Sequence, residues 1–125
     1  MKYLTLAQAL KLHAAVLVTS GGTDGIRDLG RLESAVRTQE QAVFGSELYP
    51  GIIDKAAALI RGIINDHPFV DGNKRTGMLA GLSLLRINDG ELVIKEGEIE
   101  DFAVLIATNH LGVKEIAEWL HAHSS

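Results

Sequence analysis

One short segment of the sequence, residues 67–76, combines the residue types that phosphate chemistry requires. It reads His-Pro-Phe-Val-Asp-Gly-Asn-Lys-Arg-Thr and separates two stretches with helical spacing. Gly72 and Asn73 stand where the second helix begins, and free backbone N–H groups and the helix dipole favour an anion at such a terminus. Lys74 and Arg75 then place two cations in the first helical turn, where they oppose the dipole unless an anionic ligand binds. The pattern predicts a phosphate-binding site.

Two more side chains of this segment could serve a nucleotide reaction. Asp71 could hold a magnesium ion that accompanies a nucleoside triphosphate, because Mg²⁺ takes one or two carboxylates together with phosphate oxygens. Asp71 could also be an ordinary helix N-cap, and both interpretations can hold together. His67 could accept a proton from an attacking hydroxyl, or it could cap the preceding helix through a carbonyl hydrogen bond. Position alone favours the cap, whereas the clustering with the other polar residues favours the general base.

The elements around this segment are predicted to be helical. Apolar residues recur at steps of three and four through nearly the whole chain, which indicates an all-α fold of five to seven helices with little or no strand. The helical patterns cover residues 6–17, 32–39, 52–64, 73–86, 99–107 and 113–120, and Leu92–Ile94 could be a short extended segment. The length of 125 residues suits one domain spanning 1–125.

The helix that follows the polar segment is expected to be the central helix of the fold. Thr76–Leu85 carries no charge, so it is predicted to be buried on all sides. Gly77 and Gly81 lie four residues apart on one face of it. Each glycine costs a helix interior about 1 kcal/mol relative to alanine, so close packing by a neighbouring helix is expected to offset that cost.

Composition and charge exclude several classes of protein. The chain has no cysteine, which excludes disulfides and thiolate metal sites and fits a reducing, cytoplasmic location. Its first residues do not resemble a signal peptide, and its longest uncharged apolar segment is too short to cross a bilayer. The formal net charge of -4 argues against direct nucleic-acid binding, which usually requires a basic surface. We therefore expect neither a membrane nor a nucleic acid as a partner.

The remaining histidines are not predicted to do chemistry. His121 and His123 are expected to be exposed at a frayed terminus, without the partners that a metal site requires. His13 and His110 are expected to be ordinary residues on helix faces. Other nucleotide motifs are missing from the sequence, namely GxxxxGK(S/T), GxGxxG with a following acidic residue, and the HRD loop.

His67–Arg75 resembles the signature of the Fic/Doc family, HPFx(D/E)GN(G/K)R. Residues 25–35 and Phe44–Pro50 are similar to the death-on-curing (Doc) branch of that family, so the resemblance covers most of residues 4–90. It implies a compact helical bundle with the signature loop at the start of a central helix, and ATP and Mg²⁺ as cofactors. The residue roles that it implies are a general base at His67, a magnesium ligand at Asp71, a phosphate nest at Gly72 and Asn73, and phosphate contacts at Lys74 and Arg75.

Two positions assign the chain to the Doc branch of the family by resemblance. Fic adenylyltransferases usually have glycine in place of Lys74 and a second arginine in place of Met78. Doc proteins share both departures and resemble kinases that transfer the γ-phosphate of ATP to a threonine of elongation factor Tu, which arrests translation. The alternatives are a nucleotidyltransferase that attaches AMP to a protein hydroxyl, and a catalytically inactive binding module with the same fold.

Regulation is also implied by the resemblance. Self-inhibited Fic proteins carry an (S/T)xxxE(G/N) helix, and here the residue four positions before Glu96-Gly97 is Leu92. Because that motif is absent, inhibition is expected to come from a separate antitoxin chain that folds onto the protein.

Overall fold

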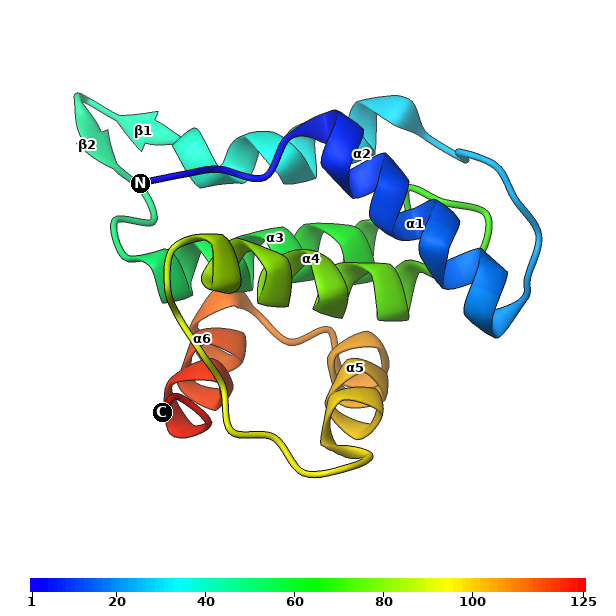
Figure 1. Ribbon diagram of the computed structural model, residues 1–125. Helices are drawn as coiled ribbons and strands as arrows, with labels where there is room; N and C mark the ends of the chain where they lie inside the picture. The colour runs from blue at the N-terminus through cyan, green and yellow to red at the C-terminus, as the bar shows by residue number, and fades with distance from the viewer.

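Helices α3 (Ile52–Asp66) and α4 (Asn73–Ile87) lie side by side through the middle of the molecule and form its largest helix–helix contact (Figure 1). The computed structural model describes all of residues 1–125. On one side of the central pair lie α1 (Leu6–Ser20) and α2 (Leu29–Arg37), and on the other lie α5 (Glu98–Asn109) and α6 (Val113–Ala122). The predicted all-α fold with a central helix is confirmed.

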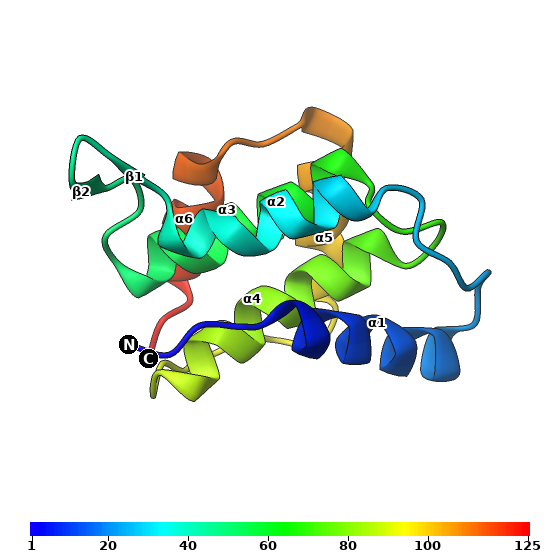
Figure 2. The same cartoon turned by 90° about the horizontal axis from the view of Figure 1, so that it is seen from above.

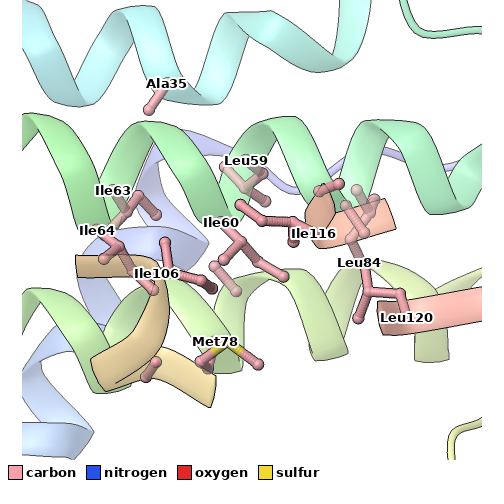
Figure 3. Close-up of a cluster of buried hydrophobic side chains, with 14 of the residues drawn as sticks. Ala35, Leu59, Ile60, Ile63, Ile64, Met78, Leu84, Ile106, Ile116 and Leu120 are labelled. Carbon is pink, nitrogen blue, oxygen red and sulfur yellow. The ribbon is translucent and has the colours of Figure 1, made fainter. Parts of the chain in front are cut away.

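The hydrophobic core forms where the other helices meet the central pair. Figure 3 shows side chains of α3 and α4 gathered with residues of α5 and α6. These fully buried residues include Leu59, Ile60, Ile63, Ile64, Met78, Leu84, Ile106, Ile116 and Leu120. The two helical glycines permit the close approach, because a Cβ at Gly77 would lie 2.7 Å from Cγ1 of Ile64, and one at Gly81 would overlap the Ile60 side chain. Close packing at both glycines is therefore confirmed.

The burial prediction for the central helix needs a correction. Within Thr76–Leu85 no residue is exposed, but Leu79, Leu82 and Ser83 are only half-buried, because no helix covers that side of α4 completely. The more deeply buried helix is α3, whose residues 55–60 and 62–64 are all buried although the sequence there is amphipathic. Its buried cation, Lys55, is 0% exposed. The Lys55 Nζ donates to the Gln39 carbonyl at 2.6 Å and to Oε1 of Glu47 at 3.1 Å.

Strand structure is limited to one small hairpin. After α2 the chain makes a 3-10 turn, η1 (Thr38–Glu40), so the second predicted helix ends earlier than its apolar pattern. β1 (Ala42–Val43) and β2 (Ser46–Glu47) then pair antiparallel, with Ala42 opposite Glu47. The hairpin lies near the N-terminal end of α3, which is the end farther from the start of α4 (Figures 1 and 2). The predicted extended segment near Leu92 forms only an isolated bridge with Ser124.

The C-terminal histidine pair was predicted to be exposed, and for His123 that prediction is wrong. His121 is exposed, but the His123 ring stacks on Trp119 with centroids 3.9 Å apart. Its Nδ1–H donates to the Trp119 carbonyl at 2.7 Å, and its Nε2–H donates to Oε2 of Glu98 at 2.7 Å. These contacts hold the end of the chain against the start of α5.

None of the helices has the length and the apolar character that a membrane span requires.

Candidate phosphate-binding site

The candidate site is the turn between α3 and α4, called here the signature loop (residues 67–72). α3 ends because His67 adopts a left-handed conformation with φ 48° and ψ 58°, and Pro68 cannot continue the helix. Gly72 is also left-handed, with φ 81°, and it is the N-cap of α4. A Cβ at Gly72 would make only ordinary contacts, 3.4 Å from Cγ1 of Val16 and 3.6 Å from Cδ2 of His13, so it is the left-handed backbone that favours glycine here.

The start of α4 offers several free backbone donors. The first backbone hydrogen bond of the helix runs from the Thr76 N–H to the Gly72 carbonyl at 2.9 Å. No side chain caps this terminus. The N–H groups of Asn73, Lys74 and Arg75 consequently have no acceptor in the chain, and the helix dipole adds partial positive charge at the same place. Such a terminus can bind an anion.

Lys74 and Arg75 add two full charges to this terminus. Both side chains are exposed, and neither forms an ion pair with the protein. They line one side of a cleft of about 320 Å³ between α1, α4 and α5. Its other lining residues are mostly apolar and are Thr19, Met78, Leu79, Ile99, Glu100, Ala103 and Val104. An anionic ligand at the helix start would therefore meet two free cations and an adjoining apolar surface.

The Asn73 side chain faces away from the free donors and holds the loop together. It is 8% exposed, and its amide donates to the Phe69 carbonyl at 2.9 Å while its Oδ1 accepts the Phe69 N–H at 2.9 Å. Phe69 is fully buried in the core, whereas Val70 is exposed. Within the predicted nest, Asn73 can thus offer its backbone N–H to a ligand, and its side chain supports the loop.

Asp71 does not cap α4, so the interpretation of it as an N-cap is wrong. The residue is exposed, and Oδ2 of its carboxylate accepts the Thr23 N–H at 2.9 Å. Its Oδ1 has no partner in the chain, which leaves one oxygen for a ligand. No group of three or more His, Cys, Asp or Glu side chains that could hold a metal ion occurs in the structure. A cation at Asp71 would therefore need further ligands from a bound substrate and from water.

His67 likewise does not act as a side-chain cap. Its half-buried ring makes no hydrogen bond within the chain, so it is not engaged by the carbonyls of Ile63 or Ile64. At the end of α3 it is Arg31 that bonds a backbone carbonyl: its Nη1 donates to the Asp66 carbonyl at 3.0 Å. Asp28 orients that guanidinium through an ion pair of 3.4 Å. The imidazole is left free to exchange a proton with a bound molecule.

The loop between α1 and α2 (residues 21–28) is joined to the signature loop by backbone hydrogen bonds. The N–H groups of Arg27 and Asp28 donate to the Pro68 carbonyl at 2.7 and 3.0 Å, and the Val70 N–H donates to the Gly25 carbonyl at 3.0 Å. Both loops lie at the same end of the bundle (Figure 2). Sequence reasoning could not find this pairing, because hydrogen bonds between distant backbone segments leave no local pattern.

Sequence reasoning also missed His13 of α1. The residue is 4% exposed, and its ring stacks on Phe69 with centroids 3.7 Å apart and planes 5° apart. Its Nε2 lies 2.8 Å from the Asp71 carbonyl oxygen. The only signal in the sequence was its place on the apolar face of α1, which does not distinguish it from a core residue.

Comparison with known proteins identifies the family of the chain. The model of the Fic/DOC family matches residues 3–85, so the chain belongs to the Fic/Doc family. It is similar to "Toxin Doc" of Mycolicibacterium smegmatis, with 36% identity over 102 residues that span 80% of this chain and 78% of the relative. It is also similar to "Protein kinase doc" of Escherichia phage P1, with 31% identity over 120 residues, or 96% of this chain and 94% of the relative.

Proposed function

We propose that this protein is a Doc-type toxin that transfers the γ-phosphate of ATP to a serine or threonine hydroxyl of a translation factor. Elongation factor Tu is the target that the resemblance favours, and arrested translation is the expected effect in the cytoplasm. The observation that carries the proposal is the uncapped start of α4, where free N–H groups and two unpaired cations adjoin Asp71 and His67. The names of the two similar proteins, one a toxin and the other a protein kinase, support the same proposal.

Each site residue receives a role in this proposal. The N–H groups of Gly72 and Asn73, together with Lys74 and Arg75, bind the phosphates and offset the charge that develops during transfer. The His67 imidazole takes the proton of the target hydroxyl. The oxygen of that hydroxyl then bonds to the γ-phosphorus as the bond to the bridging β–γ oxygen breaks, and ADP leaves. No covalent enzyme intermediate is required.

Magnesium fits this site as an ion that arrives with the nucleotide. The free Oδ1 of Asp71 supplies one carboxylate oxygen, and phosphate oxygens and water would complete the shell, which is the usual arrangement for Mg²⁺. When bound, the ion would neutralise phosphate charge, while Thr23 keeps the carboxylate in place.

The choice between phosphoryl and nucleotidyl transfer rests on Lys74 and Met78. Met78 is an uncharged core residue, so this position brings no second guanidinium to the phosphates. Lys74 is exposed at the helix start, where its side chain would obstruct the nucleotide pose that a glycine at this position permits in adenylyltransferases. Both features favour γ-phosphoryl transfer over the attachment of AMP. We expect Lys74→Gly to shift the product toward nucleotidyl transfer, which mass spectrometry of the modified target would detect.

A toxin of this kind needs a partner that restrains it. We propose that a separate antitoxin chain supplies this restraint, because the self-inhibitory motif is absent from this sequence. The apolar cleft beside Lys74 and Arg75 supports such a partner, since a segment bound there would cover the phosphate site.

Dual labelling tests the proposed activity. The protein is incubated with bacterial lysate and Mg²⁺, using ATP labelled at the γ- or the α-phosphate in parallel. We expect label from the γ-position only, on a band near the size of elongation factor Tu. His67→Ala should abolish the label, whereas His110→Ala, at an exposed histidine, should not.

Other labelling results would change the assignment. Label from the α-position would assign nucleotidyl transfer. If neither label is transferred while a partner still binds tightly, the inactive binding module is favoured.

A further inference from the structure

His13 reaches the signature loop from a different helix and contacts it at two points. Its ring stacks on Phe69, and its Nε2 lies 2.8 Å from the Asp71 carbonyl oxygen. Because a carbonyl oxygen only accepts hydrogen bonds, Nε2 must carry a proton and donate. The residue is 4% exposed, so solvent hardly competes for this bond.

This hydrogen bond determines the direction of the next backbone N–H. The Asp71 carbonyl and the Gly72 N–H belong to one peptide unit, and the structure has no cis peptide bonds. In a trans unit the C=O and N–H bonds point in opposite directions. Since the carbonyl points toward the buried His13 ring, the Gly72 N–H points away from it, and this N–H has no acceptor in the chain.

We propose that His13 is a positioning residue for the phosphate site: by holding the Asp71 carbonyl, it aims the Gly72 N–H outward as a further donor beside those of Asn73, Lys74 and Arg75. This inference rests on the proposed function for its catalytic consequence, but the binding of an anion tests it separately. Left-handed Gly72 has few steric restraints, so without His13 this peptide unit could rotate.

A purely structural role would depend on the shape of the ring and not on the donor. Two variants separate these roles. His13→Phe keeps an aromatic ring against Phe69 but removes the donor. His13→Gln loses the ring but retains an N–H donor at nearly the same reach from the backbone. The aromatic variant should therefore lose function more than the glutamine variant.

The first measurement uses inorganic phosphate and no reaction. In ¹⁵N-labelled wild-type protein we expect phosphate to shift the Gly72 amide resonance. In His13→Phe the Gly72 shift should disappear and phosphate affinity should fall about tenfold, as for the loss of one hydrogen bond to a charged group. His13→Gln should stay within about threefold of wild type, because its N–H donor keeps the Asp71 carbonyl bonded.

The second measurement follows transfer of the γ-label. His13→Phe should lower kcat/KM for Mg-ATP by about tenfold, mainly through KM, because a donor to the bound phosphates is lost. His13→Gln should recover most of this loss. If His13→Phe does not fold, the wild-type protein itself provides a test: ¹⁵N spectra of the imidazole must show a proton on Nε2, and an unprotonated Nε2 would overturn the inference.

The outcomes also separate this inference from the proposed function. Normal label transfer in the wild type together with an unaffected His13→Phe variant would overturn the role of His13 and leave the kinase assignment intact. A Gly72 shift that depends on the donor, without any label transfer, would support His13 and count against the kinase. A His13→Gln variant as defective as His13→Phe would show that ring packing, and not the donor, is what matters.

Discussion

Asp71 and Thr23, which are 48 residues apart in the sequence, are joined by a hydrogen bond of 2.9 Å from the Thr23 N–H to Oδ2 of the Asp71 carboxylate. The bond ties the α1–α2 loop to the signature loop and orients the carboxylate while leaving Oδ1 free. The proposed magnesium ligand is therefore held by a backbone group, which does not add charge to the site.

Replacement of Asp71 by asparagine should separate charge from geometry. Asparagine retains an oxygen that can accept the Thr23 N–H but loses the negative charge that attracts Mg²⁺. We expect transfer of the γ-label to fall by about a hundredfold or more, with stability changed by less than about 0.5 kcal/mol. Initial rates over a range of Mg²⁺ concentrations and thermal melting check both values.

Asp24→Asn is the matched control for this substitution. Asp24 is an exposed carboxylate on the same loop, and its Oδ1 accepts the Gly25 N–H at 2.8 Å. Its replacement should leave the magnesium dependence unchanged. An Asp71→Asn enzyme as active as this control would exclude Asp71 as the metal ligand.

Arg75→Ala should impair the use of ATP without destabilising the fold. The side chain is exposed and unpaired, and a cation in the first turn of a helix is slightly unfavourable. The melting temperature should stay constant or rise, while kcat/KM for Mg-ATP should fall about tenfold or more because a bidentate phosphate contact is lost. Arg61→Ala, at an exposed arginine of α3, should change neither quantity. A large drop in melting temperature with normal catalysis would contradict the assignment.

Asn73→Ala should lower stability as well as activity. The substitution leaves the buried N–H and carbonyl of Phe69 without partners, and each such group costs about 1–3 kcal/mol. We expect the free energy of unfolding to fall by about 2–3 kcal/mol in urea denaturation, with a loss of label transfer as the loop loosens. Asn109→Ala, at an exposed residue without side-chain bonds, serves as the control. An equal, small effect in both variants would show that the loop is held by other contacts.

The contact between His123 and Glu98 should make stability depend on pH. The hydrogen bond to the Trp119 carbonyl, followed by that to Glu98, raises the pKa of His123 above its ordinary value of 6.5. The backbone N–H of Lys95, followed by His123, lowers the pKa of Glu98 below 4.5. Folding thus favours charged His123, and this contribution is lost as pH rises through the raised pKa. It likewise favours charged Glu98, and this contribution is lost as pH falls through the lowered pKa.

Both contributions are present together between the two ordinary pKa values. The stability difference between wild type and His123→Gln should therefore be larger at about pH 5.5 than at about pH 8.5 in urea denaturation. His121→Gln, at an exposed neighbour, should show no such dependence. A difference that does not vary with pH would show that packing on Trp119 alone holds His123.

The sequence alone determined the helices, the candidate site and the family to which the chain belongs. Helical spacing is a local property, so α3 and α4 could be predicted from the residues that form them. The polar residues of the candidate site could be recognised because they lie in one continuous segment, His67–Arg75. Gly77 and Gly81 likewise indicated a close helix pair.

Only the tertiary structure decided which atoms face a ligand and which hold the loop. The Asn73 side chain turns inward and bonds to Phe69. The carbonyl at the end of α3 is bonded by Arg31 and not by His67. Asp71 is contacted by His13 from α1 and by Thr23 from the loop after α1. Except for the bond between Asn73 and Phe69, these contacts join residues 35 or more positions apart in the chain, and their directions follow from how α1 and α2 pack on the central pair of helices. Residue type and spacing cannot specify such directions, because a polar side chain forms the same hydrogen bond with any suitably placed partner.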